Sequence, residues 1–366
     1  MSVTKIPFRK KIALELFRKY RKNKSKLHQL NYILWETTLR CNLNCRHCGS
    51  DCKKDTTIKD MPASDFLNAI DQIKEIVNPN NTMIVFTGGE ALLRKDLEKV
   101  GLNLYRKGFP WGIVTNGILL NKSRLETLLN SGLRAVTVSL DGLEESHNWL
   151  RGGNKSFKKA YEAIKLLPTK SELKYDVVTC VHQKNFNELE QIKELLIETG
   201  IKHWRIFTIF PIGRAQEQKE LQLEPGAFRE LFKFIKETRK ENRIDLNYGC
   251  EGFLGNYERE VRDNFFICRA GINIASILAD GSISACPNLR ENFIQGNIYK
   301  DNFAEVWESR YKIFRDKSWT KKGICADCKF YKYCEGNGMH LRDENTGELL
   351  FCHLERIKEA EKNASP

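Results

Sequence analysis

The chain has 366 residues, enough for two or three domains, and its 41% of hydrophobic residues can form a large core. Its twelve cysteines do not indicate a secreted disulfide scaffold, because the chain is long and the cysteines cluster at metal-ligand spacings. The sequence contains no signal-peptide-like apolar run and no stretch long enough to span a bilayer. We therefore expect a cytoplasmic protein.

The formal net charge of +13 is concentrated near the N-terminus, where residues 1–26 hold ten Lys or Arg and one acid. Within this segment Phe8, Ile12, Leu16 and Tyr20 recur every four residues, which predicts a basic amphipathic helix over residues 1–30. Such a helix either packs on the domain with a solvated basic face, or it binds an anionic membrane surface or an acidic peptide. Aromatic residues are not interleaved with the charges as base stacking requires, so we do not expect nucleic acid as a partner.

Short apolar runs alternate with segments of helical period from residue 31 to residue 215, and this alternation predicts an α/β fold with a parallel sheet. We count six strand–helix units, whose strands are Tyr32–Trp35, Met83–Phe86, Gly112–Val114, Ala135–Leu140, Tyr175–Val181 and Trp204–Phe210. Ligands of such sheets bind at the carboxyl ends of the strands. A linker helix is expected over residues 216–249, a cysteine-rich domain over 250–355 and a tail over 356–366.

Three cysteines, Cys41, Cys45 and Cys48, follow the first predicted strand within eight residues. A loop this short can point three sulfurs at one centre, so that three thiolates hold three irons of a four-iron cluster and leave the fourth iron open. A zinc site is the alternative, although the three-then-two spacing differs from the paired Cys-x-x-Cys of zinc modules. This spacing resembles that of the radical S-adenosylmethionine (radical SAM) family, and the resemblance covers about residues 31–355.

The resemblance implies a partial (βα)6 TIM-like barrel and a [4Fe–4S] cluster whose open iron is chelated by the amino and carboxylate groups of SAM. It also implies that an electron from this cluster cleaves SAM to a 5′-deoxyadenosyl radical, which abstracts a hydrogen atom from the substrate. An electron donor such as flavodoxin or ferredoxin is therefore an expected partner.

The second predicted strand is followed by Gly88-Gly89-Glu90. Two glycines allow a backbone to approach a ligand closely, and the glutamate offers a carboxylate to an ammonium group. This element resembles the family's Gly-Gly-Glu element, which holds the amino group of SAM.

Other polar residues at the predicted strand ends are candidates for SAM contacts. Asn116 and Ser139 fall where the family contacts the ribose or carboxylate of SAM, although both positions also suit turn and cap residues. His147 and Arg151 match a His-x-x-x-Arg element of the peptide-modifying branch, so Arg151 would pair with the SAM carboxylate or form a surface ion pair. Cys52 and Cys180 are predicted to be bystander thiols, and the loop 211–214 is a candidate for closing over adenine or substrate.

The C-terminal cysteines resemble the SPASM extension of radical SAM enzymes, which carries auxiliary iron–sulfur clusters. The cysteines that match its second auxiliary cluster are Cys325, Cys328, Cys334 and Cys352, with a zinc ribbon as the alternative. Gly338 replaces a usual ligand of the first cluster. We expect that cluster on Cys250, Cys268 and Cys286 with one position open; the alternative is that it has been lost, so the chain has one or two auxiliary clusters.

The resemblance implies a radical SAM enzyme that modifies a peptide or protein, and it assigns no catalytic residue. Residues 249–253 and the short basic N-terminus resemble the radical SAM partner of a Bacteroidetes lipoprotein system. The alternatives are a radical SAM enzyme acting on a small metabolite or RNA, and a non-catalytic iron–sulfur electron carrier, which would have no need of Glu90.

Overall fold

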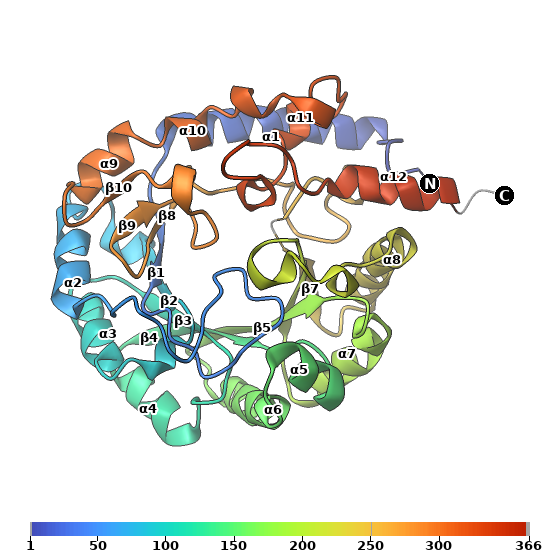
Figure 1. The fold of residues 1–366 in the computed structure, drawn as a ribbon. Coiled ribbons are helices and arrows are strands. Elements are labelled where there is room, and N and C mark those ends of the chain that lie inside the picture. The colour runs from blue at the N-terminus through green and yellow to red at the C-terminus, as the bar shows by residue number, and fades with distance from the viewer. Residues whose placement is uncertain (1, 250, 364–366) are drawn as a thin grey trace.

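The protein is described by a computed structural model that covers residues 2–249 and 251–363 (Figure 1). Its strands form one sheet in the order β10-β9-β8-β1-β2-β3-β4-β5-β6-β7. The strands are β1 Tyr32–Glu36, β2 Met83–Thr87, β3 Trp111–Thr115, β4 Leu133–Ser139, β5 Lys174–Val181, β6 His203–Thr208, β7 Asp245–Tyr248, β8 Ile274–Ile277, β9 Ser282–Ser284 and β10 Gly296–Asn297. Strands β1 to β7 pair in parallel, each with its neighbour in this order.

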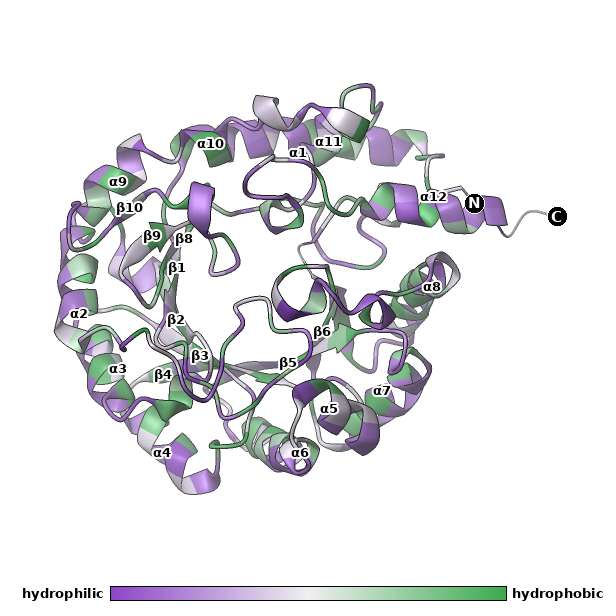
Figure 2. Ribbon diagram, viewed as in Figure 1, coloured by the Kyte–Doolittle hydropathy of each residue, from purple (hydrophilic) through white to green (hydrophobic). Residues whose placement is uncertain are grey.

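Helices surround this sheet on its outer side, and Figure 1 shows the sheet curved into a barrel; among the described residues, its two edge strands, β10 and β7, do not pair with each other. The helices are α1 Phe8–Leu27, α2 Ala63–Gln72, α3 Leu97–Arg106, α4 Lys122–Asn130, α5 Glu144–Arg151, α6 Ser156–Leu166, α7 Leu189–Glu198, α8 Pro225–Glu241, α9 Phe303–Ser309, α10 Lys312–Arg315, α11 Tyr331–Cys334 and α12 His353–Asn363. They carry both hydrophobic and hydrophilic residues, as helices that cover a core do (Figure 2). The prediction of a partial α/β barrel is confirmed, and all six predicted strands are present.

The sheet extends beyond the six predicted strands at both of its edges. Residues 216–249, predicted as a linker helix, contain α8 and also β7, which pairs in parallel with β6. β7 has only four residues, too few for alternation to be distinguished from a turn. At the other edge β8 pairs in parallel with β1, so the C-terminal cysteine-rich segment shares the sheet of the barrel.

The predicted tail is also wrong in part, because residues 356–363 continue helix α12. Leu354, Ile357 and Ala360 of α12 are buried at helical spacing, and this helix contacts α8. The apolar repeat of this segment is too short to predict a helix from the sequence.

An aromatic cluster fixes the first two strands against α2 and so sets the ends of the loop between β1 and α2. Trp35 stacks on Phe66 with ring centroids 3.9 Å apart, and Phe86 meets Trp35 edge-on at 5.2 Å. All three side chains are fully buried. Burial of three large rings with these geometries stabilises this part of the core by several kcal/mol, so the loop that carries the three cysteines starts and ends on a rigid support.

The predicted N-terminal helix is present as α1, and most of its Lys and Arg side chains are exposed as expected, but its apolar stripe is exposed as well. Leu14 and Arg21 are its buried residues, whereas the apolar stripe that begins at Phe8 faces solvent. Arg21 donates to the carbonyl oxygens of Tyr333 and Lys332 at 2.5 and 3.0 Å, so a cation anchors the inner side of the helix. In the described part of the chain, no helix is both long and apolar enough to cross a membrane.

Candidate active site

A cavity of about 330 Å³ lies at the carboxyl ends of the barrel strands. Cys41, Cys45 and Cys48 all line it, together with residues that end β2, β3, β4 and β6. The first two cysteines are buried and Cys48 is half-buried. The structure therefore brings the three predicted cluster ligands to the expected side of the sheet and to one cavity.

The loop that carries these cysteines is clamped by the loop after β6. Arg214 donates its amide to the Cys48 carbonyl at 3.1 Å and its Nε to the Cys45 carbonyl at 2.8 Å. Gly213 has a φ of +59°, and a Cβ there would lie 2.5 Å from the Cys48 carbonyl oxygen. The loop 211–214 thus contacts the cysteine loop itself. That it also closes over adenine or substrate stays a prediction.

The two glycines after β2 let the start of the cysteine loop pack onto them. A Cβ on Gly88 would lie 2.3 Å from the Thr38 carbonyl oxygen, and a Cβ on Gly89 would lie 2.1 Å from that of Arg40. The Gly89 amide donates to the Thr38 carbonyl at 2.7 Å. Both glycines also line the cavity. Because these glycines have no side chain, the backbone of the cysteine loop can pack directly against them. For the same reason their own backbone is accessible to a ligand in the cavity.

The carboxylate of Glu90 is buried directly behind these glycines, with 1% of the residue exposed. Its Oε1 accepts from Thr115 Oγ1 at 2.8 Å and from the Leu92 amide at 3.1 Å, and its Oε2 accepts from the Asn116 amide at 2.8 Å. Burial raises the pKa of Glu90, although these hydrogen bonds oppose the rise. It forms no ion pair with a described residue, and Oε2 has room for a further donor.

A buried ion pair joins Asp141, which follows β4, to Arg151 on α5. Burial alone would raise the pKa of Asp141, but the Arg151 guanidinium lowers it to about 2. Arg151 lines the cavity, and its Nη1 lies 3.9 Å from the Cys45 sulfur. His147, one helical turn earlier, accepts the Asp141 amide at Nδ1 at 3.0 Å. The alternative prediction, that Arg151 forms an ion pair at the surface, is therefore wrong, because Asp141 holds its guanidinium inside the site.

The two other predicted SAM contacts, Asn116 and Ser139, both line the cavity. The Asn116 side chain is fixed on both sides, because its Nδ2 donates to Asn42 Oδ1 at 2.8 Å and its Oδ1 accepts the Ile118 amide at 3.0 Å. Asn42 belongs to the cysteine loop, so Asn116 ties the end of β3 to that loop. Contact of either residue with SAM stays a prediction.

The cysteines are chemically suited to a metal that supplies positive charge. Burial raises the pKa of the Cys41 thiol to about 11, and it also raises that of Cys45. Cys48 differs, since its contact with Cys52 lowers its pKa to about 6. The Cys52 amide lies 3.4 Å from the Cys48 sulfur, and Cys52 itself lines the cavity. Buried thiols favour the thiolate when a cation binds them, so this donor set fits an iron–sulfur cluster.

Sequence reasoning missed that His47 and Cys180 belong to the same site. Ligand atoms of His47, Asp141 and Cys180 lie within 4.8 Å of one another, and the His47 Nδ1 is buried with no hydrogen-bond partner among the described residues. Both His47 and Cys180 line the cavity. The alternation within β5 was the available signal: Val177, Thr179 and Val181 face the buried side, which turns Cys180 toward the barrel interior.

The four C-terminal cysteines predicted to share a cluster also converge. Cys325, Cys328, Cys334 and Cys352 line one small cavity. Arg342 Nη2 lies 3.6 Å from the Cys325 sulfur, and the Asn337 amide nitrogen lies 3.2 Å from the Cys334 sulfur. No disulfide is present among the eleven described cysteines. Four thiols with N–H donors directed at their sulfurs suit a closed four-thiolate cluster.

The predicted first auxiliary site is described only in part, because Cys250 lies outside the described residues. Cys268 is buried, and its sulfur lies 3.5 Å from the Met339 amide. A Cβ on Gly338 would lie 2.7 Å from both the Glu251 carbonyl oxygen and the His340 ring, so a larger residue at 338 would require these neighbours to move. A cluster on Cys250, Cys268 and Cys286 stays a prediction.

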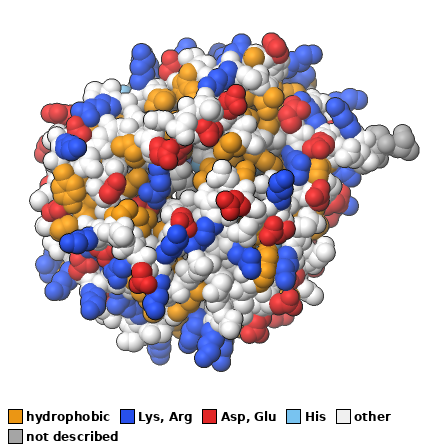
Figure 3. Space-filling view, viewed as in Figure 1, with side chains coloured by type: hydrophobic (Ala, Val, Ile, Leu, Met, Phe, Trp, Pro, Cys, Tyr) orange, Lys and Arg blue, Asp and Glu red, His pale blue; other side chains and the backbone are white. Residues whose placement is uncertain are grey.

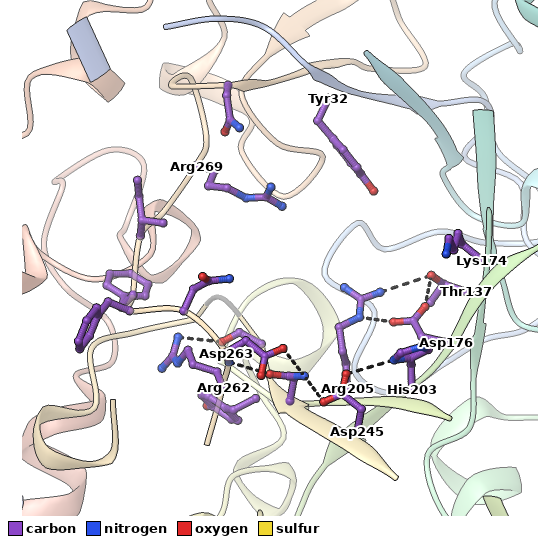
Figure 4. Close-up of a pocket in the computed structure, with 18 of the residues that line it drawn as sticks. Tyr32, Thr137, Lys174, Asp176, His203, Arg205, Asp245, Arg262, Asp263 and Arg269 are labelled. Atoms are coloured by element: carbon purple, nitrogen blue, oxygen red, sulfur yellow. Dashed lines mark hydrogen bonds and ion pairs between the residues drawn. The ribbon is translucent and has the colours of Figure 1, made fainter. Parts of the chain in front are cut away.

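A larger cavity, of about 820 Å³, lies at the opposite, amino-terminal ends of β4 to β6 (Figure 4). Four of its charged residues pair with one another: Arg205 pairs with Asp176, and His203 lies 3.1 Å from Asp245. None of the described cysteines lines it. The site with redox-active ligands is therefore the smaller cavity at the carboxyl ends.

Comparison with known proteins identifies the two halves of this arrangement. The model of the radical SAM superfamily matches residues 35–196, and that of the iron–sulfur cluster-binding domain SPASM matches residues 268–329. An AdoMet-dependent heme synthase of Methanosarcina barkeri is 27% identical over 322 residues, which cover 83% of this chain and 90% of that protein. The PqqA peptide cyclase of Bradyrhizobium diazoefficiens is 22% identical, over 90% of this chain and 91% of that protein.

The fold is also similar to solved structures. The structure of native anSMEcpe with bound AdoMet and Cp18Cys peptide superposes with a TM-score of 0.70 at 21% sequence identity, covering 92% of this chain and 96% of that one.

The close approach at Gly89 predicts that Gly89→Ala lowers the iron content of the reconstituted protein. The added methyl group must push away the Arg40 carbonyl, at a cost of about 1–3 kcal/mol, and this displaces the cysteine loop. Iron and sulfide per chain measure the effect after anaerobic reconstitution. Gly226→Ala on α8 is the matched control, because no atom lies within 4 Å of a Cβ there. Equal iron content in the two variants would contradict the role assigned to Gly89.

Proposed function

Because this chain belongs to the radical SAM superfamily and carries a SPASM-type C-terminal domain, we propose that it modifies a peptide or protein substrate at the cavity lined by Cys41, Cys45 and Cys48. Its cofactors are a [4Fe–4S] cluster, SAM and auxiliary iron–sulfur clusters. We include an electron donor such as flavodoxin or ferredoxin as the partner that supplies the reducing electron.

The observation that carries this proposal is the buried carboxylate of Glu90 beside three thiols. A buried carboxylate is costly unless a cation compensates it; the charge of Arg151 lowers the pKa of Glu90, but no described residue forms an ion pair with this carboxylate. The ammonium group of SAM would supply Glu90 with a positively charged hydrogen-bond donor. Arg151 lies on the same cavity and is suited to the SAM carboxylate, while Asn116 and Ser139 offer polar contacts to the remainder.

Cys41, Cys45 and Cys48 would hold the cluster, which with SAM would supply the radical chemistry of the reaction. The residues of this chain hold and orient the reactants. Asp141 fixes Arg151, and Thr115 with the Asn116 amide fixes Glu90. The buried loop around Cys41 and Cys45 keeps bulk water from the thiols. A non-catalytic electron carrier would require none of these SAM-directed groups.

The size of the cavity favours a substrate that inserts one side chain. A volume of about 330 Å³ is close to the lower limit for a small-molecule site, and we assign it to SAM together with the cluster that the three cysteines would hold. The substrate then approaches at the mouth, which suits an extended peptide better than a bulky ligand that needs enclosure. The similarity to a PqqA peptide cyclase supports this choice. On the face viewed in Figure 3, Lys and Arg alternate with Asp and Glu, which does not favour RNA.

The proposal predicts that the reconstituted protein makes 5′-deoxyadenosine from SAM and dithionite under anaerobic conditions. Changing Cys41, Cys45 and Cys48 to Ala should abolish this product, because no other thiol set at the cavity can hold the cluster, yet the iron bound by the C-terminal cysteines should remain. Chromatography measures 5′-deoxyadenosine, and iron analysis is the parallel readout. A triple variant that still forms the product would disprove the assignment.

A second candidate substrate is an iron porphyrin. Its support is the similarity, at 27% identity over most of both chains, to an AdoMet-dependent heme synthase; an Fe-coproporphyrin III synthase of the same organism is 26% identical. A planar macrocycle would need far more room than the cavity offers, so this candidate requires the loops at the strand ends to open.

Titration of the holoenzyme with Fe-coproporphyrin III separates the two substrate classes. If the substrate is a peptide, the porphyrin absorption band should not shift, and the porphyrin should not increase 5′-deoxyadenosine formation. Saturable binding that also consumes the porphyrin would overturn the peptide proposal, while the SAM-cleaving activity would remain established by the cysteine variants. The resemblance of residues 249–253 to a Bacteroidetes lipoprotein system stays a prediction.

A further inference from the structure

The outward face of α1 carries an unusual concentration of exposed apolar side chains. Phe8, Ile12, Leu16, Tyr20 and Leu27 are 76, 48, 62, 52 and 52% exposed. They make up five of the eleven large hydrophobic side chains exposed in the described part of the chain, although α1 has only 20 residues. Single exposed hydrophobics need no explanation, but a row of them along one helix marks a binding surface.

The inner face of the same helix is held mainly by polar and charged contacts. Arg21 is buried and its Nη2 lies 2.9 Å from Glu335, while Glu15 accepts from Lys332 Nζ at 2.5 Å and from the Tyr333 hydroxyl at 2.8 Å. Farther along, Lys10 pairs with Glu260 at 2.9 Å. A surface helix usually buries its apolar stripe and exposes its charges. α1 binds the protein through these ion pairs, the buried Leu14 and the ring contact of Phe17 with Phe265, and leaves most of its large apolar side chains outside.

Exposed cations flank the apolar row. They are Arg9, Lys11, Arg18, Lys19, Lys22 and Lys26. Arg18 pairs with Glu15, and the other five form no ion pair with a described residue. Figure 1 shows α1 along the outer edge of the molecule beside α10 and α11, where a flat surface can reach it.

We propose that α1 is a peripheral anchor that lies in the headgroup region of an anionic lipid bilayer. The apolar side chains insert toward the acyl chains, and the flanking Lys and Arg contact lipid phosphates. A 20-residue helix is about 30 Å long, so side chains along its whole length can contact one surface, although Tyr20 also lines the cavity at the amino-terminal ends of the strands. An acidic peptide could satisfy the cations, but it would leave an apolar row with five large side chains in water.

The anchor also positions the rest of the enzyme. Because Arg21 and Glu15 join α1 to α11 and its neighbours, the C-terminal four-cysteine region lies next to the bilayer whenever α1 is bound. The inference is independent of the substrate class, since none of these α1 residues lines the cavity at Cys41.

Sedimentation of the reconstituted full-length protein with vesicles tests the proposal. Vesicles of equal parts phosphatidylglycerol and phosphatidylcholine should bind the protein at 100 mM salt, and pure phosphatidylcholine should bind it weakly. The double variant Ile12→Glu, Leu16→Glu should lower affinity for the anionic vesicles about tenfold or more, since it removes two apolar anchors and adds two repelling charges.

The matched control is Ile76→Glu, Tyr105→Glu, which makes the same change in charge at side chains 39 and 49% exposed on the barrel side. It should lose affinity only slightly, and both double variants should keep wild-type iron content and circular dichroism. If the two variants lose affinity equally, net charge alone drives binding and the anchor does not exist. Failure of the wild-type protein to bind anionic vesicles would overturn the proposal as well.

Discussion

The buried carboxyl group of Glu90 is the constraint around which the site is built. Three hydrogen bonds hold its carboxylate at the junction of β2 and β3, but hydrogen bonds from neutral donors do not replace a counter-charge. Gly88 and Gly89 bring the start of the cysteine loop against the same strand end. The three thiols line one small cavity, and the Glu90 carboxylate lies behind its wall, bonded to the Thr115 hydroxyl and the Asn116 amide of two residues that line it.

The C-terminal region is joined to this site through the shared sheet. β8 adds to β1 in parallel, and Glu36 at the end of β1 is buried between the Ala279 amide, 3.1 Å away, and the Arg290 guanidinium, with which it forms an ion pair. The cysteines of the SPASM region are thus fixed relative to the barrel by main-chain pairing and a partly buried charge pair. A rigid connection of this kind suits cofactors that exchange electrons or present a substrate.

The sequence was sufficient for features that repeat or follow a fixed spacing. Alternating apolar runs predicted β1 to β6, and cysteine spacing predicted which thiols share a cavity. It was insufficient where geometry depends on distant residues: β7 and β8 are four-residue strands that only pairing defines. His47 could not be placed at the site without the structure, whereas the alternation within β5 already turned Cys180 toward the barrel interior. The stripe on α1 was visible in the sequence, but its outward orientation depends on the contacts of Arg21.

The central claim is that Glu90 compensates the ammonium group of SAM, and the SAM affinity of Glu90→Gln tests it most directly. The variant keeps the shape and most hydrogen bonds of the side chain but removes the charge, so isothermal titration of the reconstituted enzyme should show affinity lower by roughly 10- to 100-fold, which corresponds to about 1.5–3 kcal/mol. Iron content should be unchanged. Wild-type affinity in Glu90→Gln with full iron content would contradict the account.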